Sequence, residues 1–323
     1  MEARRGSLER TLLRDITDYA TFSNVTAVVL SLDQEKAFDR GDWSFMLGIR
    51  DGLRSILSSM SPFSFYRCSG LCSCQWLFIP ILFVLSRGVR QGCPLSPLLY
   101  VLVSEVLAVN IRANPRITGH LIPGSQTPLS PISQYADDTS LIVNSDDAIL
   151  AVFDTYSRFE AASGSKLNVS KSKGLWLGAW NNRSDPPVQL EWTSEKIKVL
   201  GVYVGPGDLE EANWRPRIAA VENVLSSWRQ RALSFRGRAL VIGSLALSRI
   251  GRYVASLIHM PLWVHAELAR LIFPFFWNGK QDLVAREVVT QPPTAGGFSV
   301  VDIKLKVSSL LVQWIRRYAS SPS

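Results

Sequence analysis

The order in which apolar patterns follow one another along the 323 residues constrains the fold most strongly. Residues 25–32 (VTAVVLSL) form a β-branched, apolar run that is typical of a buried strand. The pattern is helical over residues 97–112, indicates two tightly joined strands over 132–144, and is helical again over 147–162. Residues 197–204 (IKVLGVYV) follow as another strand-like run. This order predicts an α+β fold with a split βαβ-like antiparallel sheet covered by helices.

The second part of the chain has a different pattern. A helix is predicted first, over residues 7–20, but beyond residue 206 the apolar spacing indicates only long amphipathic helices. These helices are expected around residues 214–229, 237–257 and 263–277. We therefore predict three regions: an N-terminal helix in residues 1–24, an α+β region in 25–204, and an all-helical region in 205–323.

The charge of the chain is unevenly distributed. Its 35 Lys and Arg residues exceed its 27 Asp and Glu residues, which gives a net charge of +8. Residues 196–323 contain 17 basic and 8 acidic side chains, so the surplus lies in the helical region. A basic surface of this kind is typical of proteins that bind polyanions.

The cysteine and hydropathy patterns indicate in which cellular compartment the protein is expected. The four cysteines are too few and too clustered for a secreted disulfide framework, and no nearby histidine completes a zinc site. An intracellular protein is expected, without a choice between nucleus and cytoplasm. The longest apolar run, residues 75–85, is shorter than the roughly 20 residues that cross a bilayer, so no membrane partner is expected. The sequence does not determine an oligomeric state.

Three carboxylates are the candidate reactive groups. Asp33 follows the predicted strand 25–32, and Asp137 and Asp138 occupy the turn of the predicted hairpin. If these strands are neighbours, the acids meet at one place, where like charges either raise a pKa or require a cation. Two Mg²⁺ ions held there would suit in-line nucleotidyl transfer. The alternative is that an Asp-Asp pair is ordinary turn chemistry and that Asp33 is only a strand end.

The residues around these acids carry a resemblance to a known family. The three segments LSLDQEKAFDR, RGVRQGCPLSPLLY and YADD, in this order, closely resemble sequence blocks of reverse transcriptases from LINE-type (non-LTR) retrotransposons. Downstream, SGSKLNVSKSK and IKVLGV are similar to a fourth and a fifth block. The residues that carry the resemblance are, in the same order, 30–40, 87–100, 135–138, 163–173 and 197–202, followed by Trp228, 276–280, Gly296 and Gly297.

The resemblance implies both an architecture and a reaction. The expected fold is a polymerase-type palm followed by an all-helical thumb and connection region. The expected activity is RNA-templated DNA polymerisation with two Mg²⁺ ions, or Mn²⁺ in their place, acting on an RNA template, a DNA primer and deoxynucleoside triphosphates. In this resemblance Asp33, Asp137 and Asp138 are the catalytic, metal-holding acids.

Further residues acquire expected roles from the resemblance. Phe38 matches a bulky steric gate that would exclude a ribose 2′-hydroxyl, although plain core packing is an equal alternative. Arg90, Gln91 and Gly92 match the loop that touches the nucleotide and the template, where glycine permits close backbone approach and glutamine offers an amide. Arg87 and Arg90 could contact phosphate, and the equal alternative is that they are solvated loop arginines.

Basic side chains complete the expected site. Lys171, or less favourably Lys166, matches the lysine that protonates pyrophosphate as a general acid. The helical region has no acid between residues 223 and 266, and its arginines can bind phosphate in a bidentate manner. A solvated helix face is the alternative. The arginines expected to contact the nucleic-acid backbone are Arg229, Arg231, Arg236 and Arg238.

Two departures from the family qualify these expectations. Only 32 residues precede Asp33, so we expect a fragment that lacks an endonuclease and most of the fingers. Residues 48–85 do not resemble the family, and a shifted reading frame is our hypothesis for this divergent insert. A catalytically inactive remnant that at most binds nucleic acid is therefore the second hypothesis. The specific residues of the sequence blocks disfavour a relative of maturases or telomerases.

Overall fold

The protein folds into two compact units. The computed structural model describes residues 13–52, 73–74, 77–78, 87–89, 92–121, 128, 130–250 and 260–319. The first unit, called here the sheet unit, comprises residues 1–200 and 204–206, and the second, the helical unit, comprises residues 201–203 and 207–323. Each unit is described by itself. Arg90, Gln91 and most of the divergent insert lie outside the described residues.

A five-stranded sheet with the order β4-β5-β1-β6-β7 forms the centre of the sheet unit. β1 (Ala27–Leu32) is antiparallel to both β5 (Asp138–Val143) and β6 (Lys173–Leu177). β4 (Ile132–Tyr135) extends the sheet beyond β5, and β7 (Glu191–Thr193) pairs in parallel with β6. β1 is therefore the central strand.

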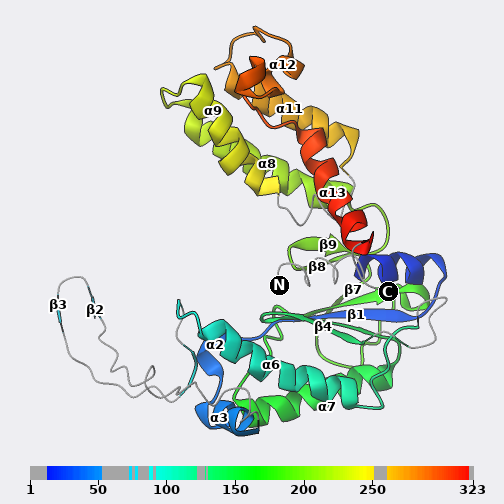
Figure 1. Ribbon diagram of the computed structural model, residues 1–323. Coiled ribbons are helices and arrows are strands. Elements are labelled where there is room, and N and C mark those ends of the chain that lie inside the picture. The colour runs from blue at the N-terminus through cyan, green and yellow to red at the C-terminus, as the bar shows by residue number, and fades with distance from the viewer. Residues whose placement is uncertain are drawn as a thin grey trace. The chain divides into compact units, whose positions relative to one another are not determined.

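Both faces of β1 are covered, which explains its uninterrupted apolar sequence. Alternate residues of a strand point to opposite faces. Val28, Leu30 and Leu32 belong to the core between the sheet and helices α6 and α7. Ala27 and Val29 belong to a second core, between the sheet and a helix over residues 13–22. Figure 1 shows this N-terminal helix and the pair α6 and α7 on opposite sides of the sheet.

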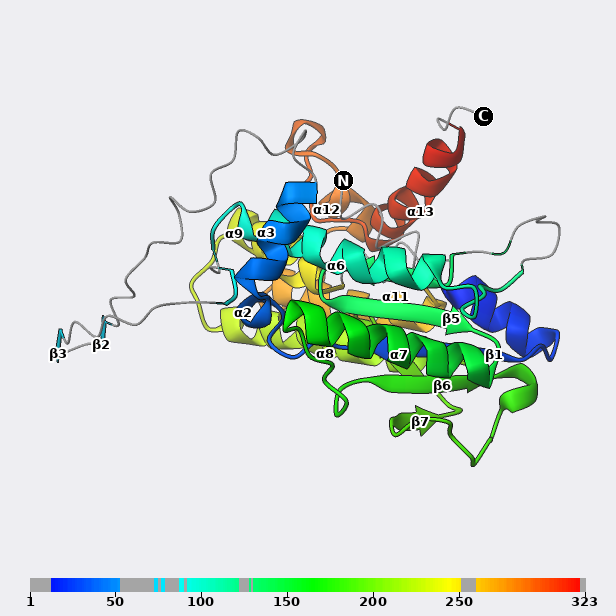
Figure 2. The same cartoon turned by 90° about the horizontal axis from the view of Figure 1, so that it is seen from below.

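Two long helices lie side by side over one face of the sheet, as Figure 2 shows. They are α6 (Ser96–Ala113) and α7 (Asp146–Ser163), and the short helices α2 (Ala37–Arg40) and α3 (Trp43–Gly52) pack near them. The Ser145 hydroxyl caps α7 by accepting from the backbone N–H of Ala148 at 3.2 Å. Gly164 ends the helix in the left-handed conformation, which a glycine adopts without strain.

Helix α6 is long and apolar enough to cross a membrane when judged by length and composition alone. Its packing gives a different reason for that composition. The buried residues of α6 include Tyr100, Val103, Leu107, Ala108 and Ile111. The last four belong to the core between the sheet and helices α6 and α7. We therefore describe α6 as a core helix of the sheet unit.

The chain also contains shorter elements. The 3₁₀ helix η1 (Gly178–Trp180) follows β6, and the two-residue strands β2 (Ser73–Cys74) and β3 (Leu77–Phe78) pair with each other. β8 (Ile197–Val199) and β9 (Val202–Val204) form a two-stranded sheet.

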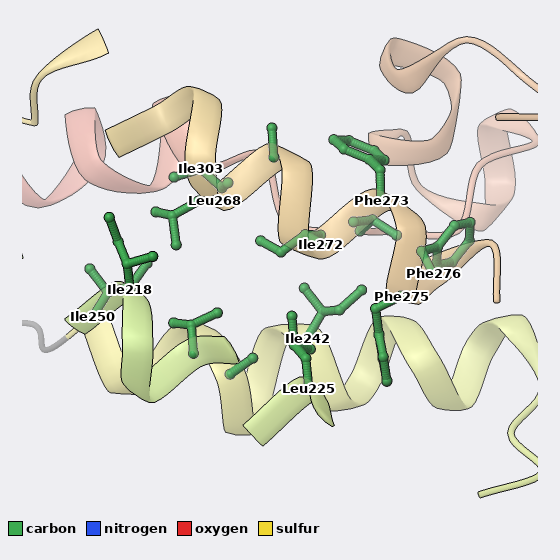
Figure 3. Close-up of a cluster of buried hydrophobic side chains, with 14 of the residues drawn as sticks. Ile218, Leu225, Ile242, Ile250, Leu268, Ile272, Phe273, Phe275, Phe276 and Ile303 are labelled. Atoms are coloured by element: carbon green, nitrogen blue, oxygen red, sulfur yellow. The ribbon is translucent and has the colours of Figure 1, made fainter. Parts of the chain in front are cut away.

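The helical unit is built around one apolar core. Figure 3 shows side chains of α8, the segment after α9, and α11 pointing toward one another, including Leu225, Ile242 and Ile272. The Asn213 side chain of α8 hydrogen-bonds to the backbone of Tyr203 in β9 as a neighbouring strand would. It accepts from Tyr203 N at 2.8 Å and donates to Tyr203 O at 3.1 Å. The elements are α8 (Glu210–Arg229), α9 (Phe235–Val241), the π-helical η2 (Ile242–Ala246), η3 (Leu247–Ile250), α11 (Leu262–Phe276), α12 (Arg286–Thr290), η4 (Pro293–Ala295) and α13 (Ile303–Ala319).

The structure confirms the predicted α+β class and corrects two details. The continuous strand expected over residues 197–204 is wrong, because Leu200 and Gly201 have φ values of 49° and 82° and form a turn between β8 and β9. β6 and β7 were not predicted. β6 contains Gly174, a residue disfavoured in strands, but a Cβ at this position would lie 2.3 Å from the Trp192 ring of β7. The glycine makes room for that ring.

Candidate active site

The strand register brings the three candidate carboxylates to one end of two neighbouring strands. Leu32 of β1 pairs with Thr139 of β5, so Asp33 comes next to Asp138 at the next step along the strands. Tyr135 pairs with Asp138, which leaves Ala136 and Asp137 as a two-residue turn. Ala136 adopts a φ of 55°, the left-handed backbone that a tight hairpin requires.

Electrostatic coupling accompanies this placement. Partial burial of its carboxylate is the largest cause of a raised pKa at Asp138, and the charges of Asp137 and Asp33 raise the pKa further. Burial likewise raises the pKa of Tyr100, with added contributions from all three carboxylates. Asp137 and Asp33 therefore act on Asp138, and all three acids act on the Tyr100 hydroxyl.

The donor set suits a divalent cation in chemical type. Carboxylate oxygens are hard ligands of the kind that Mg²⁺ prefers, and mutual repulsion among them would be relieved by bound positive charge. Within the described residues, however, no three His, Cys, Asp or Glu side chains are drawn together closely enough to hold a metal ion. The three acids therefore fit such an ion in their chemical type.

A buried serine holds the backbone at Asp33. The Asp33 N–H donates to the Ser172 hydroxyl at 3.0 Å, and that hydroxyl donates to the Asn168 carbonyl at 2.8 Å. Asn168 N in turn donates to the Asp33 carbonyl at 2.8 Å, and Glu35 N donates to the Lys166 carbonyl at 2.8 Å. The segment after β1 is thus fixed by the loop before β6.

Tyr100 connects the segment after β1 to helix α6. Its hydroxyl donates to Gln34 Oε1 at 2.9 Å, and its ring stacks on Phe38 with centroids 4.9 Å apart and an interplanar angle of 27°. Tyr100 and Gln34 are buried, whereas Phe38 is half-buried. Phe38 is therefore partly packed and partly accessible, so both interpretations of this residue remain compatible with its position.

The loop before α6 packs against α2. Gly88 has a φ of +80°, and a Cβ there would approach backbone atoms of Asp39 to 2.8 Å, so only glycine fits. Gly88 N donates to the Gly41 carbonyl at 2.8 Å, and Val89 N donates to the Phe38 carbonyl at 2.6 Å. Gly92 is exposed with a φ of +84°, and a Cβ added there would meet no atom of the described residues within 4 Å, so its backbone is open to approach.

The two candidate lysines have different surroundings. Lys166 lies 3.9 Å from Glu35, whose carboxylate also pairs with Arg40 at 2.7 Å. The Arg40 hydrogen bond is the main cause that lowers the pKa of Glu35. Lys171 is exposed, directly precedes Ser172, and forms no ion pair with any residue in the described part of the chain. Lys171 therefore has the freer ammonium group.

The four candidate arginines of the helical unit divide into two groups. Arg229, Arg231 and Arg236 are exposed, and Arg231 stacks 4.3 Å from the centre of the Trp228 ring. Arg238 is only 6% exposed, and its guanidinium donates to the carbonyls of Phe275 at 2.7 Å and Leu233 at 3.2 Å. This placement corrects the prediction for Arg238, because its donors bind the protein's own backbone.

Sequence reasoning missed Ser172, Gln34 and Tyr100. Ser172 lies within a family block, but nothing in its type indicates that its hydroxyl meets a residue 139 positions away. Gln34 gave a possible signal, because it is a polar residue that continues the alternation of a buried strand. Tyr100 offered one as well, since a buried tyrosine usually needs a hydrogen-bond partner.

Comparison with known proteins adds independent findings. The family model described as "Reverse transcriptase (RNA-dependent DNA polymerase)" matches residues 8–204. The chain is 33% identical over 317 residues to the "Transposon TX1 uncharacterized 149 kDa protein" of Xenopus laevis, which covers 95% of this chain and 24% of that protein. It is 30% identical over 157 residues to the "Retrovirus-related Pol polyprotein from type-1 retrotransposable element R2" of Popillia japonica, covering 47% and 21% respectively. The chain thus spans about a quarter or less of the length of these relatives.

Proposed function

Because the chain belongs to the reverse transcriptase family, among the LINE-type (non-LTR) retrotransposon proteins, we propose that it synthesises DNA on an RNA template. The observation that carries this proposal is the register of β1 and β5, which brings Asp33 beside the hairpin acids Asp137 and Asp138. In this proposal the sheet unit is the polymerase palm, with boundaries near residues 25 and 204, and the helical unit is the thumb and connection region.

Asp33, Asp137 and Asp138 would hold two divalent ions, Mg²⁺ or Mn²⁺. When bound, the ions would supply Lewis-acid stabilisation of the attacking and leaving oxygens in nucleotidyl transfer. The protein's own contribution is to fix the acids. Ser172 holds the Asp33 backbone, and the two-residue turn restricts Asp137 and Asp138. Such preorganisation avoids a conformational cost during the reaction.

Other side chains would bind and select the substrates, which are an RNA template, a DNA primer and deoxynucleoside triphosphates. The half-buried Phe38 ring would occupy the space of a ribose 2′-hydroxyl. Gly92, with Arg90 and Gln91 outside the described residues, would let the backbone approach the nucleotide and template. Lys171 would donate a proton to the leaving pyrophosphate.

The exposed arginines Arg229, Arg231 and Arg236 would bind the nucleic-acid backbone. Guanidinium groups make bidentate hydrogen bonds to phosphate, and no acid occurs between residues 223 and 266 to neutralise them. Binding through such contacts weakens as salt concentration rises.

A second candidate function is nucleic-acid binding without polymerisation. The observation that favours it is that, among the described residues, no three His, Cys, Asp or Glu side chains lie close enough together to hold a metal ion. A chain of this kind would retain the arginine surface of the helical unit and the family fold but would not extend a primer.

Primer extension separates the two functions. The purified chain is incubated with a primed RNA template, Mg²⁺ and labelled deoxynucleotides, beside an Asp137→Ala/Asp138→Ala variant. Asp185→Ala is the matched control, because Asp185 is an exposed acid of the same unit outside the candidate site. Extension by the wild type and the control, lost in the double variant, would support polymerisation. No extension by a folded chain that binds RNA would refute it and leave the second function.

A further inference from the structure

We propose that Tyr100 is a positioning residue that sets the preference for deoxynucleotides by holding Phe38 in place and joining it to the segment of Asp33. The inference rests on the proposed function, since it concerns the selectivity of the same site. Three observations carry it: a ring stack, a buried hydrogen bond and the burial of Tyr100 and its neighbours on helix α6.

The stack limits where the Phe38 ring can lie. Phe38 sits in the four-residue helix α2, which has no buried residue of its own, so α2 alone cannot fix the ring. The Tyr100 ring supports one face of Phe38 at a centroid distance of 4.9 Å, and Val89 N donates to the Phe38 carbonyl at 2.6 Å. Because a steric gate excludes by position, a ring free to rotate away would discriminate less between sugars.

The hydrogen bond joins the same tyrosine to the catalytic segment. The Tyr100 hydroxyl donates to Oε1 of Gln34, which immediately follows Asp33, and Gln34 is 5% exposed. Gln34 also forms a β-bridge with Leu167. The Tyr100 side chain therefore contacts both Gln34, which directly follows Asp33, and Phe38, which lies four residues after Gln34 in α2.

Helix α6 gives Tyr100 its rigidity. Tyr100 is 4% exposed, and Val103, Leu107 and Ile111 in the following turns of the helix are buried in the core between α6 and the sheet. A side chain that is packed in this way sits in a rotamer minimum with little free space around it. Tyr100 can thus transmit the position of the palm core to Phe38 and Gln34 together.

Two substitutions separate the two contacts. Tyr100→Phe keeps the ring beneath Phe38 but removes the hydrogen bond that the Tyr100 hydroxyl donates to Gln34 Oε1. Tyr100→Met removes the ring and fills much of its volume with a flexible side chain. We expect Tyr100→Phe to extend primers more slowly with unchanged sugar preference, and Tyr100→Met to lose about tenfold of that preference, the scale of one aromatic pair.

Sugar preference can be measured without catalysis. The full chain is bound to an RNA template carrying a DNA primer that ends in a dideoxynucleotide, and the dissociation constants of the next complementary deoxy- and ribonucleoside triphosphates are compared. Extension of the ordinary primer is measured in parallel. Tyr19→Leu is the matched control, because Tyr19 makes an edge contact with His120 elsewhere in the same unit.

The outcomes distinguish this inference from the polymerase proposal. Wild-type preference for the deoxynucleotide without primer extension would refute polymerisation but leave the role of Tyr100 supported if Tyr100→Met weakens that preference. Equal binding of both sugars by the wild type, or full preference in a folded Tyr100→Met variant, would overturn the inference. If Tyr100→Met fails to fold, the Tyr100→Phe variant tests the inference instead. A changed sugar preference or an unchanged extension rate in Tyr100→Phe would overturn the inference. A wild type that captures no nucleotide overturns both.

Discussion

Replacing Ser172 with alanine should weaken the sheet unit at the point where it holds Asp33. Ser172 has no exposed surface, and its hydroxyl both accepts from Asp33 N at 3.0 Å and donates to the Asn168 carbonyl at 2.8 Å. Alanine removes both hydrogen bonds and adds no group that could replace them.

The cost comes mainly from one of the two partners. The Asn168 carbonyl still accepts from Lys171 N at 3.2 Å and from Ser172 N at 3.0 Å, so it stays satisfied. The Asp33 N–H loses its acceptor. An unpaired buried donor costs about 1–3 kcal/mol, and the half-buried position of Asp33 favours the lower part of that range, about 1–2 kcal/mol.

Amide hydrogen exchange of the full chain, read by mass spectrometry on peptides that cover Asp33 and Asn168, measures this loss locally. Protection should fall about five- to thirtyfold, the ratio equivalent to about 1–2 kcal/mol. Ser170→Ala is the matched control: its exposed hydroxyl contacts only the Asn168 side chain, at 2.8 Å, among described residues. Equal protection in the two variants would refute the claim that Ser172 holds the Asp33 backbone. Primer extension should fall in Ser172→Ala alone.

Glycine, arginine and histidine positions provide further tests by urea unfolding. Gly88→Ala should destabilise by about 2 kcal/mol or more, because its Cβ would lie 2.8 Å from backbone atoms, whereas Gly92→Ala should cost about 1 kcal/mol from backbone strain alone. Arg238→Met should lose about 1–3 kcal/mol, because it removes the hydrogen bonds of a buried guanidinium to the carbonyls of Phe275 and Leu233, while Arg236→Ala should leave stability unchanged and weaken only salt-dependent RNA binding. Burial lowers the pKa of His120, so stability should fall as pH drops below about 6.5, and His120→Gln should lose that dependence.

The sign of the histidine prediction follows from proton linkage. Between the lowered folded pKa of His120 and its unfolded value of 6.5, the unfolded chain binds more protons than the folded one. Stability therefore rises with pH in that window and is lost as the pH falls through it. A flat response of the wild type between about pH 7.5 and pH 5 would contradict the buried, neutral state of this side chain.

Much of the fold follows from local patterns. The apolar run of β1 and the helical spacing of α6 and α7 predicted these elements to within two residues of their observed bounds. The resemblance to LINE-type reverse transcriptases, carried by short blocks around the acids, is confirmed by the family and relatives that the chain matches. Local periodicity suffices for such features because each depends on neighbours in the chain.

Other features needed contacts between distant segments. Glycine is disfavoured in strands by residue type, yet Gly174 lies in β6, where the Trp192 ring occupies the space that a side chain would need. Arg238 was predicted to bind nucleic acid with the three exposed arginines, but its donors bind the carbonyls of Phe275 and Leu233. In both cases residue type predicts the opposite of what packing selects, because packing depends on the partner and not on the residue alone.

The sequence by itself determined the residue types, the strand and helix periods, the family and the presence of three acids within the sequence blocks that resemble that family. Only the tertiary structure decided the register of β1 against β5 and the hydrogen bond from Asp33 to a serine 139 residues away. It also decided the stack of Tyr100 on Phe38. Periodicity encodes which face of an element is buried, whereas register and side-chain pairing arise only when separate elements pack together.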